Sequence, residues 1–187
     1  MGVMKEGPVT EDHINSFGHI VHIFARLELI MQGIITRLGN ADFALVIVLT
    51  AGLGYSGKRD ALLSVLANTQ GRDAEVETIK KFLGKFHKWN TVRNAVAHHS
   101  WKAGVRPGSI KPLSIAVRGG SGKFKGQDPK EPDYTAEDLV EIGNELGQLY
   151  NDFVVYLDSV KLLPFIAQDT AANSSLTPSS PSDPSAK

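Results

Sequence analysis

Three long stretches of this chain repeat apolar residues at helical spacing, and they restrict its fold more than any other feature. They cover residues 10–39, 73–98 and 135–160 of the 187-residue sequence. Apolar side chains three and four positions apart form a stripe along one helix face, which has to be buried against another element. The strand–helix alternation that a parallel sheet requires is missing from the pattern. We therefore predict an all-α fold with the long helices packed as a bundle.

Capping residues mark the ends of the first and last of these helices. Thr10 is a suitable N-cap for the first helix, and the Gly-Asn pair at positions 39–40 is a suitable stop. Thr135, followed three residues later by Asp138, has the pattern of a capping box for the last helix, which we expect Pro164 to end. These local signals agree with the limits of the apolar period.

The segments between the long helices are harder to interpret. Residues 43–50 are almost entirely apolar, and periodicity cannot separate a short buried strand from a helix there. Residues 61–66 are predicted to form a short helix. Residues 102–132 are rich in glycine and proline, and within them 110–117 could form a strand that pairs with 123–125. We predict a short β-like insertion between the last two long helices.

The chain is predicted to form one domain over residues 10–167. Residues 1–9 are an N-terminal extension, and residues 168–187 are a polar tail with too little to bury, which we expect to be disordered. The 20 basic and 20 acidic side chains cancel, so overall charge predicts no obligatory nucleic-acid or membrane partner. The absence of cysteine excludes disulfides and thiolate catalysis. Without a secretory signal or a long apolar run, we expect a soluble cytoplasmic protein.

Residues 52–59, GLGYSGKR, have the glycine and lysine spacing of a phosphate-binding P-loop. Arg59 stands where that loop needs Ser or Thr to bind magnesium. The aspartate that would complete such a site, Asp158, lies in a segment of helical rather than strand period. Nucleotide binding through 52–58 is a remote alternative, and a glycine-rich connector between two helices explains this stretch better.

Residues 91–101, TVRNAVAHHSW, combine an arginine, an asparagine and two histidines. On a helix, Asn94 and His98 share a face, whereas Arg93 lies roughly 140° from His98. A polar helix end would explain the cluster, because Arg and His favour the negative end of the helix dipole. However, Arg93 continues a core-facing stripe, where a guanidinium is costly unless it is paired or used. A swung arginine, a helix that ends near His98, or a second subunit could each bring the two groups together.

The pattern Arg93-Asn94-x-x-x-His98, placed on the penultimate long helix, resembles the motif of the HEPN superfamily. The resemblance extends to the order of elements over about residues 10–165, with a short basic helix at 58–66, a tryptophan soon after the motif and a final amphipathic helix. It implies a HEPN-like helical bundle. It also implies a homodimer in which the motif helices meet at the two-fold axis, so that two arginines and two histidines share one cleft.

HEPN proteins include metal-independent endoribonucleases of toxin or defence type, and non-catalytic relatives that bind RNA, nucleotides or protein. In the catalytic case the 2′-hydroxyl of RNA is the nucleophile, and the products carry 2′,3′-cyclic phosphate and 5′-hydroxyl ends. His98 would move the proton, Arg93 would neutralise the phosphate, and Asn94 would bind phosphate or orient the histidine. We expect no cofactor and no metal, and an antitoxin is a further candidate partner. The alternative is a non-catalytic binding or dimerisation module.

Two other groups of polar residues have competing interpretations. His19 and His22, with His13 one or two turns earlier, have neither a third ligand nor a carboxylate close to the pair, so they fit the boundary of an amphipathic helix better than a metal site. Residues 102–130 carry seven basic side chains against one acid, which describes either a solvated loop or a basic lip that attracts RNA phosphates. The candidates for contact with RNA are Lys102, Arg106, Lys123 and Lys125.

Overall fold

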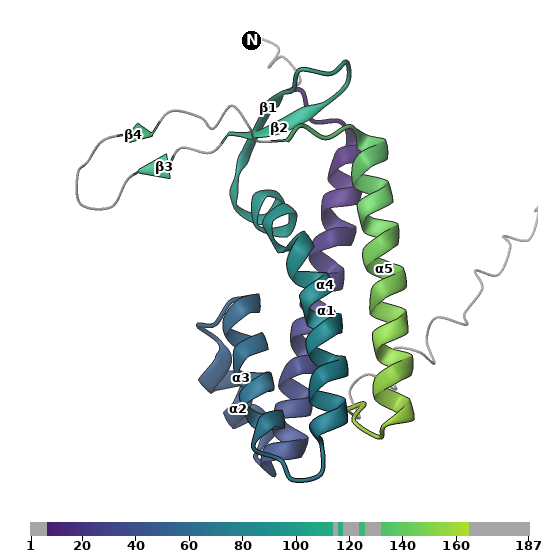
Figure 1. Cartoon of the computed structure of the whole chain (residues 1–187). Coiled ribbons are helices and arrows are strands. Elements are labelled where there is room, and N and C mark those ends of the chain that lie inside the picture. Colours follow the sequence, from purple (N-terminus) through teal and green to yellow (C-terminus); the bar gives the residue numbers. More distant parts are fainter. Residues whose placement is uncertain (1–6, 114–115, 118–123, 126–131, 165–187) are drawn as a thin grey trace, which may run out of the picture.

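The computed structural model describes residues 7–113, 116–117, 124–125 and 132–164. Five helices dominate this part of the chain (Figure 1): α1 Glu11–Gly39, α2 Phe43–Thr50, α3 Tyr55–Ala67, α4 Asp73–His98 and α5 Ala136–Ser159. The short strands β1 Ser100–Ala103, β2 Ile110–Leu113, β3 Ala116–Val117 and β4 Phe124–Lys125 lie between α4 and α5. The all-α prediction is confirmed. Most of the predicted N-terminal extension (1–6) and the whole predicted tail (168–187) lie outside the described residues.

The capping signals place the long helices correctly. Helix α1 follows the N-cap Thr10, and Asn40 ends it in the left-handed conformation with φ of 46°. At the start of α5, the backbone N–H of Asp138 donates to the Thr135 hydroxyl at 3.2 Å, and the Thr135 N–H donates to the Asp138 carboxylate at 2.8 Å. This reciprocal pair is the capping box that the sequence predicts. Helix α5 ends at Ser159, before Pro164.

Residues 43–50 form a helix, which resolves the ambiguity between helix and strand. The Asp42 carboxylate caps α2 by accepting a hydrogen bond from the Leu45 N–H at 3.0 Å. At the other end, the Thr50 hydroxyl accepts a hydrogen bond of 2.6 Å from the Gln32 side-chain amide of α1. Both Gln32 and Thr50 are buried. Helix α2 is therefore held against α1 by a specific polar contact as well as by packing.

Helix α3 begins at Tyr55, so the predicted start at residue 61 was wrong. The Tyr55 hydroxyl donates a 2.6 Å hydrogen bond to the Leu83 carbonyl of α4, and burial raises the pKa of this phenol. This long-range bond fixes the first turn of α3, and no local pattern in the sequence predicts it. The glycine-rich connector before α3 is correspondingly short, covering residues 51–54.

The strand pairing differs in part from the prediction. Strand β3 pairs antiparallel with β4, as expected for the end of 110–117 and residues 123–125. Strand β2 instead pairs antiparallel with β1, which the sequence analysis did not predict, and Trp101 lies opposite Pro112. A strand of four residues is too short to show a clear alternation, because it offers only two side chains to each face.

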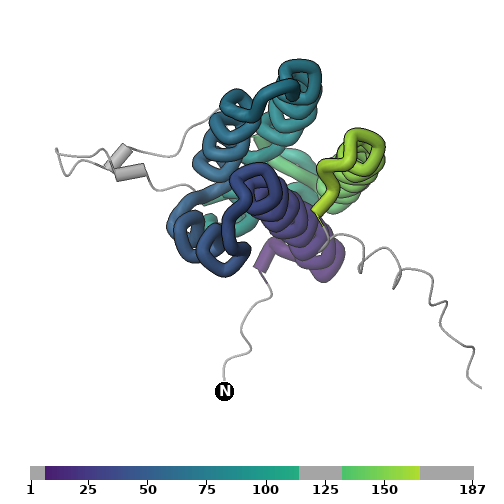
Figure 2. The backbone as a smooth tube through the Cα atoms, turned by 90° about the horizontal axis from the view of Figure 1, so that it is seen from below, coloured from purple at the N-terminus to yellow at the C-terminus, as the bar shows by residue number. Residues whose placement is uncertain are grey.

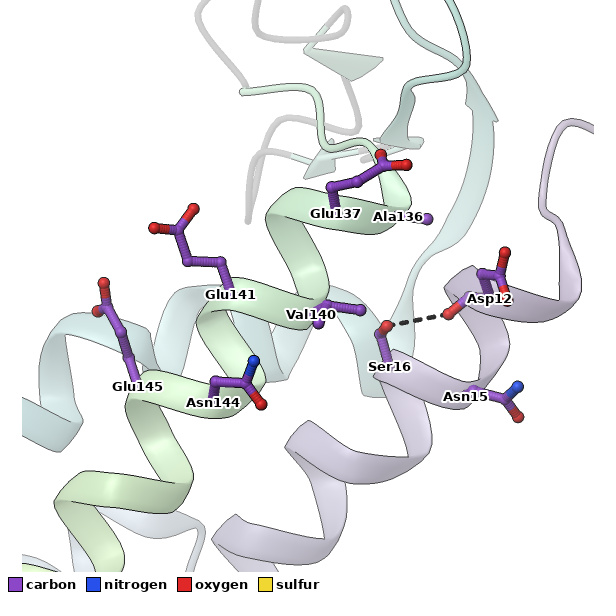
Figure 3. A pocket seen from close by; sticks show the side chains of 9 residues that line it. All are labelled: Asp12, Asn15, Ser16, Ala136, Glu137, Val140, Glu141, Asn144 and Glu145. Carbon is purple, nitrogen blue, oxygen red and sulfur yellow. Dashed lines mark hydrogen bonds between the residues drawn. The ribbon is translucent and has the colours of Figure 1, made fainter.

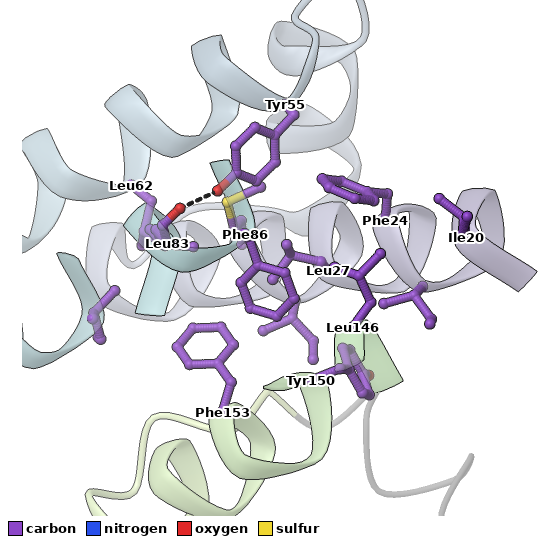
Figure 4. Close-up of a cluster of buried hydrophobic side chains, with 14 of the residues drawn as sticks. Ile20, Phe24, Leu27, Tyr55, Leu62, Leu83, Phe86, Leu146, Tyr150 and Phe153 are labelled. Carbon is purple, nitrogen blue, oxygen red and sulfur yellow. Dashed lines mark hydrogen bonds between the residues drawn. The ribbon is translucent and has the colours of Figure 1, made fainter. Parts of the chain in front are cut away.

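The core lies where α1 meets α3, α4 and α5 (Figures 2 and 4). Phe24 of α1 packs edge-on against Tyr55 and against Phe86 of α4, with ring centroids 5.4 Å and 6.4 Å apart. Phe86 in turn packs against Phe153 of α5 at 6.2 Å. These rings are almost completely buried, and each contributes a large apolar area to stability. The aromatic cluster sets the relative positions of the helices that carry the polar site described below.

Helix α1 is, among the described residues, the single helix that is long and apolar enough to cross a membrane. Half of its most apolar window is buried inside the bundle. Its buried residues, which include Ile20, Phe24, Leu27 and Ile34, face the other helices. A core helix of this length meets the same criteria of length and composition, and the packing accounts for the apolar character of α1.

Candidate functional site

Helix α4 carries the Arg-Asn-His motif on its last turns. Its inward face buries Phe86, Val92 and Ala95, and this packing orients the polar residues between them. The helix ends at His98, because His99 adopts an extended conformation with φ of −105° and ψ of 147°. The helix thus ends at the motif histidine, as one of the three arrangements considered from sequence requires, but this end does not bring His98 into contact with Arg93.

Arg93 is held in place by two hydrogen bonds. One terminal nitrogen donates to the Glu28 carboxylate of α1 at 3.1 Å, and the other donates to the Asn94 side-chain oxygen at 3.1 Å. The Arg93 side chain keeps 20% of its surface exposed, whereas its inner Nε is buried and has no hydrogen-bond partner. The guanidinium is thus fixed in direction while retaining donor capacity.

Glu28 also accepts a hydrogen bond of 2.6 Å from the Lys58 ammonium of α3. The side chains of Glu28 and Lys58 are only 12% and 10% exposed. We call Glu28, Lys58 and Arg93 the Glu28 cluster. It joins α1, α3 and α4 through one carboxylate and two cations, so it carries one positive charge that no group within it balances. In a poorly solvated position, such an excess favours an anionic ligand.

His98 lies apart from this cluster. It is exposed at the end of α4, and no hydrogen bond or ion pair joins it to Arg93 within the part of the chain that the structure describes. Asn94, by contrast, contacts Arg93 directly. Within one chain the structure therefore brings together two of the three predicted catalytic residues and leaves the histidine free to meet a ligand or another subunit.

Trp101 fixes the chain immediately after the motif. Its ring stacks on Phe17 of α1 with centroids 4.9 Å apart, and Tyr134 packs edge-on against it at 6.3 Å. His99 alone separates the end of α4 from the start of β1 at Ser100. The β1–β2 hairpin is consequently anchored to α1 right beside His98.

Arg106, one of the predicted RNA contacts, is occupied by acidic partners. Its guanidinium binds the carboxylates of Asp133, at 2.9 Å, and Asp138. The backbone N–H groups of Arg106 and Val105 also donate hydrogen bonds to the Asp133 carboxylate, and so does the Ser109 hydroxyl. These bonds, the two backbone ones above all, hold the pKa of Asp133 well below its usual range. Arg106 therefore closes the loop between β1 and β2 onto the start of α5 instead of presenting a free charge.

The other predicted RNA contacts are placed less fully. Lys102 is half-buried on β1, directly opposite Lys111 of β2, and it takes part in an interaction with its surroundings. Lys125 lies on β4, where the backbone alone is described, and Lys123 lies outside the described residues. Among these three lysines, Lys102 alone has a described side chain, so a common basic surface stays a prediction.

The P-loop interpretation of 52–58 is not supported by the geometry. The segment that precedes this stretch is helix α2 rather than a strand. The Lys58 ammonium, which would have to bind phosphate, lies on Glu28. Asp158 belongs to helix α5. These positions do not form the strand, loop and aspartate that a P-loop site requires.

The N-terminal histidines have structural surroundings. His13 is buried, and its Nδ1 accepts a hydrogen bond from the Thr10 N–H at 3.2 Å, within the cap of α1. The His19 ring lies so close to α5 that a side-chain carbon at Gly143 would approach it to 2.8 Å. Among the described residues, no group of three or more His, Cys, Asp or Glu side chains is placed to hold a metal ion.

A pocket of about 460 Å³ lies between the first turns of α1 and α5, and no motif residue lines it (Figure 3). Its acidic lining residues are Asp12, Glu137, Glu141 and Glu145. Four carboxylates would repel the phosphates of RNA. This pocket is consequently not the place where an RNA backbone would bind.

Glu28 and Lys58 are the site residues that sequence reasoning missed. Glu28 lies between Leu27 and Leu29 in the apolar middle of α1, where an unpaired carboxylate would be costly. Its position was therefore a signal that a cation faces it. One of its two cationic partners, Arg93, is 65 positions away, so the spacing of residues could not identify it.

Comparisons of this chain with protein-family models, with curated proteins and with solved structures found no match. Its site is therefore interpreted from its own side chains and their contacts.

Proposed function

We propose that this protein acts on RNA as a HEPN-type, metal-independent endoribonuclease, with Arg93, Asn94 and His98 as its catalytic residues. The observation that carries this proposal is the fixed Arg93 guanidinium. Glu28 and Asn94 hold it beside Lys58, and the Glu28 cluster has one positive charge in excess. A phosphodiester supplies the matching negative charge, and Arg suits it because its planar donor group can bind two phosphate oxygens.

The chemistry requires a base and an acid. The RNA 2′-oxygen attacks the neighbouring phosphorus while the bond from phosphorus to the 5′-oxygen breaks, which leaves a 2′,3′-cyclic phosphate and a 5′-hydroxyl. One imidazole accepts the proton of the 2′-hydroxyl, and a second imidazole returns a proton to the leaving oxygen. Arg93 stabilises the charge that builds on the phosphate oxygens.

The position of His98 favours a dimer as the active form. It is exposed at the end of α4 and does not contact Arg93 of its own chain. A two-fold axis close to this helix end would bring two copies of His98 and two of Arg93 into one cleft. The proposal therefore includes a homodimer through the motif helix, acting in the cytoplasm, with an antitoxin as a further candidate partner.

One observation favours a second function, that of a non-catalytic module. Arg93 already has a carboxylate partner, so the Glu28 cluster also works as a link between three helices. In that case the motif would be kept for packing or dimerisation, and RNA would not be cleaved. The two functions share the same contacts and differ in whether His98 and Arg93 are needed for turnover.

The test is to incubate the purified full-length chain with RNA in the presence of EDTA. We expect cleavage that leaves 5′-hydroxyl ends, and a loss of about 10²- to 10³-fold in Arg93→Lys and His98→Ala. Arg93→Lys keeps the charge that pairs with Glu28 while losing the two-pronged donor, so folding is preserved. His99→Ala, at the exposed neighbouring position, is the matched control and should cleave normally.

Cleavage that persists in both variants, or that disappears when divalent ions are removed, would contradict this mechanism. A wild-type protein that binds RNA without cutting it, or that does neither, would favour the non-catalytic module.

A further inference from the structure

Helix α2 exposes an unusual amount of apolar surface. All residues from Phe43 to Leu49 are apolar, yet of this helix only Val46 and Thr50 are buried. Val48 and Leu49 keep 71% and 69% of their surface exposed. Figures 1 and 2 show α2 beside α3, on the side of the bundle away from α5. A contiguous exposed apolar patch of this kind often marks a site where another molecule binds.

The exposed face is held rigidly. The Gln32–Thr50 hydrogen bond and the Asp42 cap fix both ends of α2, so its outward side chains cannot turn into the core. The face continues into the connector through Leu53, which is 38% exposed and packs over Gly57 at the start of α3. A fixed, preformed surface loses little conformational freedom when a partner covers it.

We propose that the α2 face, made of Leu45, Val48, Leu49 and Leu53, is an interface that pairs with the same face of a second copy of this chain. This inference is independent of the proposed RNA cleavage. It also concerns another surface than the motif helix, because α2 packs beside α3 whereas the motif lies where α4 meets β1.

The area of the face matches what a dimer needs. These side chains expose roughly 400 Å² of apolar surface, within the range of patches of about 300–600 Å² that are often functional. Two copies would contribute roughly 800 Å², about 65% of an interface of ~1,200 Å², and homodimer interfaces have this apolar fraction and at least this size. Exposed neighbours of the patch, which include Asp42, Ala44 and Ala51, would supply part of the remaining area.

A second copy suits the face better than the alternatives. Residues 43–57 contain no charged side chain, so a partner of opposite charge would find nothing to recognise. The nearest cation, Lys58, is occupied by Glu28. Residues 165–187 contain just three large apolar side chains, too few to cover the patch. A two-fold axis perpendicular to α2 would set the two copies antiparallel, which aligns their dipoles favourably and lets the ridge at 45, 48 and 49 pack against itself.

The test measures the mass of the full-length chain in solution by light scattering and by sedimentation, from about 1 to about 100 µM, where interfaces of this size associate. We expect the wild type to include a dimer, with twice the 20.2 kDa mass of one chain. Val48→Lys should remove this association and lower the mass, to that of one chain or to that of the dimer which the proposed function places at the motif helix. Val155→Lys is the matched control, because Val155 is equally exposed, at 70%, but lies on α5.

A wild type that stays monomeric over this range would overturn the proposal and leave the face to another protein or to the chain's own tail. A mass that Val48→Lys leaves unchanged over this range, or that Val155→Lys lowers equally, would also overturn it. Because the readout is mass and not cleavage, the result does not depend on whether the motif is catalytic.

Discussion

Replacing Glu28 by glutamine tests whether the Glu28 cluster is a real electrostatic unit. The substitution keeps the shape of the side chain but removes the negative charge that Lys58 and Arg93 share. Two cations then remain in a region where the three side chains are 10% to 20% exposed. Lys58→Met, in contrast, removes one cation and leaves a balanced Glu28–Arg93 pair.

The expected magnitudes follow from burial and distance. Removing one partner of a fully buried charge pair destabilises a protein by about 3–5 kcal/mol, and an exposed pair contributes about 0–1 kcal/mol. Two cations within ~8 Å of each other repel by roughly 2 kcal/mol at an effective dielectric constant of about 20. We therefore expect Glu28→Gln to lower the free energy of unfolding by about 3 kcal/mol and Lys58→Met by about 1 kcal/mol.

The double variant gives the sharpest form of this prediction. Once Glu28 has been replaced, removing Lys58 relieves the repulsion, so the double variant should be more stable than Glu28→Gln alone by about 1 kcal/mol. Glu77→Gln is the control, since its pair with Lys80 is 3.8 Å long and about two-thirds exposed. It should change stability by less than about 0.5 kcal/mol.

Urea unfolding followed by circular dichroism and by tryptophan fluorescence measures all four variants. Calorimetry should show a fall in Tm of about 6–12 °C for Glu28→Gln and about 2–4 °C for Lys58→Met. The reasoning is refuted if Glu28→Gln unfolds like Glu77→Gln, or if the second substitution destabilises Glu28→Gln further. Either result would mean that solvent already screens the two cations.

Two more predictions concern packing and pH. Gly33→Ala should destabilise the protein by about 1–3 kcal/mol, because its added carbon would lie 2.5 Å from the Pro164 ring. Gly18→Ala is the control on the same helix: its added carbon meets nothing within 4 Å, so it should stabilise the protein by about 0.5–1 kcal/mol. Equal effects of the two substitutions in thermal unfolding would contradict this prediction. The pKa of Asp133 is lowered, so its contribution to stability is fully present above the ordinary pKa of aspartate, about 3.9, and its contacts with Arg106 are lost only as the pH falls through the lowered pKa. Hydrogen exchange should therefore show the Arg106 amide protected at about pH 5 and still protected near pH 3, where an ordinary aspartate is already largely protonated, and loss of protection there would argue against these bonds.

The long helices could be predicted because their signals are local. The stripe of apolar residues and the caps at Thr10 and Thr135 lie within a few positions of the boundaries that they determine. The position of the motif at the end of α4 was predictable for the same reason. Helix α2 was not, because a wholly apolar segment has no period to measure.

The partners of the site could not be predicted, because they depend on how distant helices pack. Glu28 approaches Arg93 only after α1 and α4 are in contact, and Lys58 joins them from α3. Arg106 shows the converse, since a surface cation in a basic stretch turned out to be paired with acids from the start of α5. Counting charges along the chain predicts neither the Glu28 cluster nor the ion pairs of Arg106.

The single residue between α4 and β1 has a mechanical consequence. With only His99 as a spacer, the last turn of the helix and the first residue of the hairpin cannot rotate independently. The stacking of Trp101 on Phe17 therefore also holds the backbone next to His98 in position. Loosening that stack would leave the hydrogen bonds of Arg93 in place and still let the His98 side chain change direction.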